Sequence, residues 1–77
     1  MFQVHIGYRF VRYTEADDCV LTLGWDWDGT PDSFWIDIPG EARWNRSMPP
    51  WARKRREEIL DRIRQSTAHM GFAENEI

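Results

Sequence analysis

The amino-acid sequence predicts an α+β fold, in which a three-stranded antiparallel β-meander is followed by one long C-terminal α-helix packed on one sheet face. Three segments alternate apolar and polar residues and are separated by turn residues, which is the pattern of half-buried strands. A later segment carries apolar residues at helical spacing between Pro50 and Gly71. The 77 residues are enough for one domain, so residues 1–77 are expected to form a single unit.

The three strands are predicted over residues 2–13, 19–27 and 33–38. Turn residues separate them at 15–18 and at 28–32. A one-residue slip would turn a whole apolar face to water, so the apolar faces set the register. The register that keeps them on one side pairs Phe10 with Leu23 and Trp25 with Ile36.

The helix is predicted over residues 50–70. Pro50 suits the first helical position, because its ring fixes a helical φ and it needs no backbone donor there. Gly71 is suited to end the helix in the left-handed conformation. Ala52, Ile59, Ile63 and Met70 fall on one face, which would cover the sheet. Residues 72–77 are expected either to add a short terminal strand or to fray.

Composition excludes several classes of protein. One cysteine, Cys19, excludes an internal disulfide and fits a reducing compartment. No apolar run reaches the roughly 18 residues that a membrane span needs, and the N-terminus lacks the features of a signal peptide. We therefore expect a cytoplasmic protein with no membrane contact.

The charge of the chain changes sign along its length. Residues 1–42 carry two arginines against eight carboxylates, and residues 43–64 carry eight basic groups against three acidic ones. The two segments are therefore about −6 and +5. A split this sharp indicates either a charged recognition surface or two halves that attract each other.

The basic segment is a candidate phosphate or nucleic-acid site. Five residues would form it, since they crowd the start of the predicted helix: Arg43, Arg46, Arg53, Lys54 and Arg55. The alternative is internal neutralisation by Glu57, Glu58, Asp61 and the acidic strand loops. The sequence leaves both open.

The outer face of the predicted sheet is a candidate protein interface. The register above places four side chains of types found in interface hot spots on this face: Arg9, Val11, Tyr13 and Trp35. The partner would be another protein or a second copy of the chain.

No catalytic or metal-binding pattern is found. Carboxylates alternate in the segment 26–32, but the calcium-loop pattern needs a glutamate at its twelfth position, where the chain has Asp37. His5, His69 and Cys19 show no catalytic or ligand spacing. We therefore expect neither an enzyme nor a bound metal or cofactor.

These observations favour a small, non-catalytic, intracellular protein-binding domain that acts as an adaptor or inhibitor. Acidic domains of this size, without disulfides, are common among bacterial and phage accessory proteins such as immunity and anti-defence factors. The alternative is a nucleic-acid-binding domain that uses the basic first half of its helix.

Overall fold

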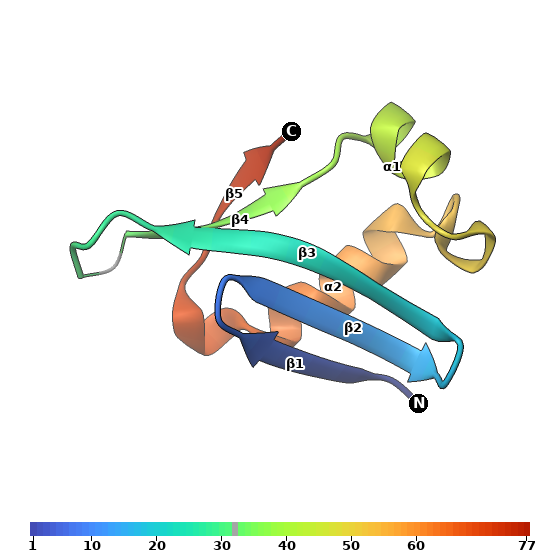
Figure 1. The fold of residues 1–77 in the computed structure, drawn as a ribbon, viewed down its shortest axis with the longest axis horizontal. Helices are drawn as coiled ribbons and strands as arrows, with labels where there is room; N and C mark the ends of the chain where they lie inside the picture. The colour runs from blue at the N-terminus through green and yellow to red at the C-terminus, as the bar shows by residue number, and fades with distance from the viewer. Residues whose placement is uncertain (32) are drawn as a thin grey trace.

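A five-stranded mixed sheet with α2 on one face forms the protein in the computed structural model, which describes residues 1–31 and 33–77. The sheet order is β1-β2-β3-β4-β5; neighbouring strands are antiparallel except β4 and β5, which are parallel. Figure 1 shows α2 behind the sheet and no helix in front of it. The strands are β1 (Gln3–Gly7), β2 (Phe10–Ala16), β3 (Cys19–Trp27), β4 (Phe34–Ile38) and β5 (Ala73–Glu76).

The helical segments follow β4. Helix α1 (Glu41–Ser47) is followed by a 3₁₀ turn, η1 (Pro50–Ala52), and then by α2 (Arg56–Ser66). A second 3₁₀ turn, η2 (Ala68–Met70), leads to β5. None of these helices is long and apolar enough to cross a membrane, within the described residues.

The α+β class is confirmed, but the predicted three-stranded meander with one long helix is wrong. The segment 2–13 is two strands, β1 and β2, joined by the two-residue loop Tyr8-Arg9. Arg9 adopts a left-handed φ of 65°, which is uncommon for a residue other than glycine. The indole Nε1 of Trp25 holds the loop, since it donates to the carbonyls of Gly7 (2.9 Å) and Phe10 (3.1 Å).

The loop reverses which residues of β2 face the helices. β2 pairs with β3 one position away from the predicted register, so that Phe10 lies opposite Gly24 and Val11 opposite Leu23. Val11 and Tyr13 are consequently fully buried. Their predicted place on the outer face is wrong, because a turn inside the alternating segment shifts the phase of everything after it.

The other end of the sheet follows the prediction more closely. β3 and β4 have the predicted register, with Trp25 opposite Ile36 and Trp27 opposite Phe34. The C-terminal segment forms a strand, β5, which pairs in parallel with β4. Asp32, which was predicted to lie in the turn at 28–32, is outside the described residues.

The predicted helix over 50–70 is broken into three pieces. Arg53 is extended (ψ 141°) and Lys54 is left-handed (φ 64°), so the chain leaves η1 before α2 begins. Two hydrogen bonds to side chains of α1 hold this break. Trp44 Nε1 donates to the Ala52 carbonyl (2.9 Å), and Asn45 Oδ1 accepts a bond from Lys54 N (2.8 Å). The predicted stop at Gly71 is confirmed, with a left-handed φ of 64°.

The hydrophobic core lies between α2 and the inner face of the sheet. Ile59, Leu60 and Ile63 of α2 are almost fully buried against side chains from β2, β3 and β4. Trp44 is also fully buried, and it fastens α1 to this core. The opposite face of the sheet is left uncovered by helices (Figure 1).

The left-handed Arg9 leads to a stability prediction. Replacing Arg9 by glycine should make the protein about 1 kcal/mol more stable than Arg9→Ala, because glycine adopts this conformation without the steric cost that an L side chain incurs. Equilibrium urea unfolding of the two variants measures the difference. The alanine variant is the matched control, since both changes remove the guanidinium. Equal stability would contradict the prediction.

Candidate interaction surfaces

A shared carboxylate joins β2 to α2. Thr14 lies opposite Val20 and Ala16 opposite Cys19, so Glu15 is the extra residue of a β-bulge. Its Oε1 accepts hydrogen bonds from Tyr13 Oη (2.7 Å), Arg55 Nη2 (2.6 Å) and Arg62 Nη1 (3.2 Å). Charge-assisted bonds of this kind are about twice as strong as neutral ones.

A second carboxylate, Glu58, completes the network. Arg55 forms two hydrogen bonds with it, and Arg62 Nη2 lies 3.2 Å from its Oε2. The hydrogen bonds from Arg55 and then from Tyr13 lower the pKa of Glu15, and the bonds from Arg55 lower the pKa of Glu58. Burial raises the pKa of Tyr13, and the bond to Glu15 raises it further.

Two further arginines of the basic segment are also paired. Arg56 bonds to Glu57 (2.6 Å), and Arg64 bonds to Asp61 (2.9 Å) and to Glu74 of β5 (2.7 Å). Arg55, Arg56, Arg62 and Arg64 are all half-buried. These four arginines are therefore neutralised within the protein, which was the alternative to a phosphate site. Arg55, which was predicted to contact phosphate, is bound to Glu15 and Glu58 instead.

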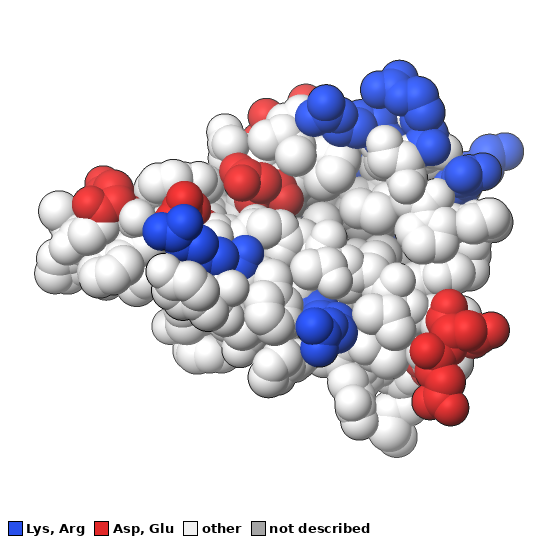
Figure 2. All heavy atoms as spheres, viewed as in Figure 1, with Lys and Arg blue, Asp and Glu red and all other residues white. Residues whose placement is uncertain are grey.

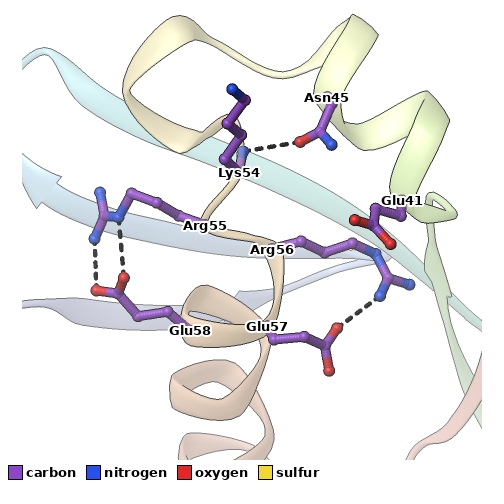
Figure 3. Close-up of a pocket in the computed structure, with 7 residues that line it drawn as sticks. All are labelled: Glu41, Asn45, Lys54, Arg55, Arg56, Glu57 and Glu58. Atoms are coloured by element: carbon purple, nitrogen blue, oxygen red, sulfur yellow. Dashed lines mark hydrogen bonds and ion pairs between the residues drawn. The ribbon is translucent and has the colours of Figure 1, made fainter.

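Figure 3 shows a hollow of about 380 Å³ where α2 begins. Three cations and three carboxylates line it with Asn45, so its charge is balanced. Within it Arg55 turns toward Glu58 and Arg56 toward Glu57, and the Lys54 side chain points away from both pairs. The hollow is lined by Glu41, Asn45, Lys54, Arg55, Arg56, Glu57 and Glu58.

The other four basic residues of the segment form a separate group, which we call the cationic cluster: Arg43, Arg46, Arg53 and Lys54. All four are exposed, and no carboxylate of the described residues lies within 4.0 Å of their charged groups. Figure 2 shows basic side chains gathered over α1 and the loop that follows it. Four of the five predicted phosphate-contact residues are thus brought together on one surface.

The uncovered sheet face carries a second group, the aromatic–arginine patch: Tyr8, Arg9, Phe10, Arg12 and Trp35. The Arg12 guanidinium lies 4.8 Å from the centre of the Phe10 ring, and that of Arg9 lies 5.3 Å from the Tyr8 ring. Tyr8 is 81% exposed and Trp35 is half-buried. The face that Figure 2 shows is mostly uncharged, with separated basic and acidic groups.

The sequence interpretation missed Tyr8, Phe10 and Arg12 as surface residues, because it placed Tyr8 and Phe10 on the buried face. The glycine at position 7 is the signal that could have revealed the turn. A Cβ built there would lie 2.0 Å from the Phe10 ring, so the ring packs directly over the glycine backbone. Of the predicted interface residues, Arg9 and Trp35 lie on the outer face.

The remaining candidate groups are dispersed. His5 lies on the outer face and His69 in η2, while Cys19 begins β3. Hydrogen bonds from Ser33 and Thr30 lower the pKa of Asp28 to about 2, so this carboxylate is satisfied within its own turn. Within residues 1–31 and 33–77 no three metal-ligating side chains come together.

No protein-family model, curated protein or solved structure matches the chain.

The shared carboxylate leads to a prediction of pH dependence. The pKa of Glu15 is lower in the folded protein than its ordinary value of 4.5, so its contribution to stability is present above pH 4.5 and is lost as the pH falls through the folded pKa. Glu15→Gln should therefore lower the free energy of unfolding at pH 7 by about 1–2 kcal/mol, and by less at pH 3. Urea unfolding at both pH values measures this.

Glu41→Gln is the matched control. Glu41 is exposed, and no ion pair to it is found among the described residues, so the change should leave the free energy of unfolding almost unaltered. A Glu15→Gln variant that loses the same stability at pH 3 as at pH 7 would show that the carboxylate charge is not what stabilises the contact between β2 and α2.

Proposed function

We propose that the protein is a small, non-catalytic protein-binding domain, an adaptor or inhibitor of the kind found among bacterial and phage accessory proteins. Its partner would be another protein, bound on the uncovered sheet face. The observation that supports this most is the aromatic–arginine patch, because Tyr, Trp and Arg are the residues that dominate binding energy in protein interfaces. The patch lies on the face that no helix covers.

The geometry of the patch suits a protein partner. Arg9 is held by the left-handed loop, with its guanidinium over Tyr8 and its Nε 3.7 Å from Asp26 Oδ1. Arg12 is held over Phe10 in the same way. Side chains already ordered before binding lose less conformational entropy when a partner arrives.

The charge of the face favours a protein over a polyanion. Asp26 pairs with Arg9, and Asp37 accepts a hydrogen bond from Asn75 (2.8 Å), so two carboxylates lie among the arginines. These carboxylates would repel phosphate. The molecule measures 37 × 26 × 18 Å, and this face extends along the two longer axes. It is therefore large enough for a standard protein interface, which covers about 800 Å² on each partner.

The patch gives a binding prediction. Tyr8→Ala and Arg12→Ala should each weaken partner binding at least about tenfold, since truncating a hot-spot residue costs about 2 kcal/mol or more and about 1.4 kcal/mol is a factor of ten. The immobilised protein would be used to capture partners, and the affinity of each purified partner would be measured by calorimetry. Trp35→Ala should also weaken binding, and its unfolding midpoint would be recorded because Trp35 is half-buried.

Gln65→Glu provides the control, because Gln65 is exposed on α2, which lies behind the sheet. A partner that uses the sheet face should bind the patch variants more weakly and bind the Gln65→Glu variant with unchanged affinity. Sedimentation of the protein over a range of concentrations would detect a second copy as the partner. A partner that all three patch variants retain would show that the sheet face is not the binding surface.

A further inference from the structure

We propose that the cationic cluster binds the phosphate backbone of double-stranded nucleic acid without reading its sequence. This surface lies apart from the aromatic–arginine patch, and the inference does not depend on the proposed protein partner. It rests on the separation of the eight basic residues of the segment 43–64 into two groups. Four are half-buried and paired with carboxylates, and the four of the cluster are exposed and have no such partner among the described residues.

This separation is informative because the chain is acidic overall. It has 13 carboxylates against 10 lysines and arginines, so carboxylates are plentiful enough to neutralise every cation. Arg55 and Arg62 share Glu15 and Glu58 between them, while no carboxylate among residues 1–31 and 33–77 pairs with the four residues of the cluster. Four unneutralised cations close together raise the local positive potential, which attracts polyanions.

Three hydrogen bonds hold the cluster in place. Trp44 Nε1 donates to the Ala52 carbonyl (2.9 Å), which brings α1 and its two arginines to the loop that carries Arg53 and Lys54. Lys54 N donates to Asn45 Oδ1 (2.8 Å), and Arg53 Nε donates to the Met48 carbonyl (2.9 Å). The fold therefore sets the backbone positions of the cluster, and the Arg53 guanidinium is itself held by a hydrogen bond.

One residue of the cluster, Lys54, has an uncommon backbone conformation. Lys54 is left-handed (φ 64°), a conformation that disfavours a lysine and breaks the helix predicted from 50 to 70. The break separates Arg53 and Lys54 from the first turn of α2. In Figure 3 the Lys54 side chain accordingly points away from the ion pairs of Arg55 and Arg56.

The surroundings favour a duplex over a single strand. Single strands are usually held by aromatic rings on which the bases stack. Of the two aromatic rings in this segment, Trp44 is fully buried, and Trp51 is half-buried with its ring stacked on Tyr13 (6.3 Å) and covered by Arg55 (5.9 Å). Arginine and lysine side chains that contact only phosphates position a protein on a duplex but carry no sequence information.

The salt dependence of binding tests the inference. With four phosphate contacts, the affinity for a duplex DNA should fall about 150-fold between 50 and 200 mM salt, because the slope of log affinity against log salt is about −0.9 per contact. Fluorescence anisotropy would be measured with labelled duplex DNA and duplex RNA of equal length. We expect both to bind in the micromolar range at 50 mM salt, and the tighter duplex would identify the source of the phosphates.

A double variant measures the contribution of the cluster. Arg46→Gln with Lys54→Gln leaves two contacts, so the same change in salt should weaken duplex binding only about 12-fold. Gln65→Glu with Ser66→Glu is the matched control, because it alters the net charge of the protein by the same two units at exposed positions beyond the cluster. The unfolding midpoint of each double variant would be recorded, so that a loss of binding is compared between folded proteins.

Two results would overturn the inference. If the unchanged protein binds neither duplex at 50 mM salt, the cluster is not a nucleic-acid site. If the two double variants weaken binding equally, the effect comes from net charge and not from the cluster. Neither result bears on the sheet face, because Tyr8 and Arg12 are unchanged in all of these proteins.

Discussion

The contact on which the rest of the structure depends is the sharing of Glu15 by Tyr13, Arg55 and Arg62. The β-bulge at Glu15 supplies the carboxylate, and Tyr13 supplies a buried hydroxyl beside it. Arg55 immediately precedes α2 and Arg62 lies within it, so the carboxylate joins both the start of this helix and its second turn to β2. Removing one partner would leave charged groups partly desolvated, which costs more than the pair contributes.

This contact also determines which cations remain available. Arg55 lies between the break at Lys54 and the start of α2, and from there it bonds to Glu15. In a continuous helix over 50–70, Arg53, Lys54 and Arg55 would follow one another at 100° intervals around one axis. The break instead assigns Arg55 to the interior network and leaves Arg53 and Lys54 with the arginines of α1. Internal neutralisation and an external positive surface are therefore both present, on different residues.

The two proposed surfaces differ in the physical basis of binding. The aromatic–arginine patch shares its face with Asp26 and Asp37, and it would gain affinity from ring burial and ordered guanidinium groups, which salt affects little. The cationic cluster would gain affinity from counterion release, which salt weakens strongly. A domain with both could hold a protein partner near a nucleic acid. Their different dependence on salt allows each to be measured in the presence of the other.

Several features could be predicted from the sequence because their causes are local. The hairpin of β3 and β4 has its predicted register, since a turn rich in aspartate, glycine and proline separates two clearly alternating strands. Gly71 ends the helical segment as predicted, because glycine adopts the left-handed conformation at little cost. Ile59 and Ile63 are buried as their helical spacing indicates.

The sequence by itself determined the α+β class, the β3–β4 pairing, the end at Gly71 and the gathering of basic residues after position 42. Only the tertiary structure decided the turn at Tyr8-Arg9, the break at Lys54 and the pairing of β5 with β4. Each of these depends on a partner distant in sequence: Trp25 for the turn, Asn45 for the break and β4 for the last strand. Local propensity cannot report such contacts, because their free energy exists only when the distant segments have come together.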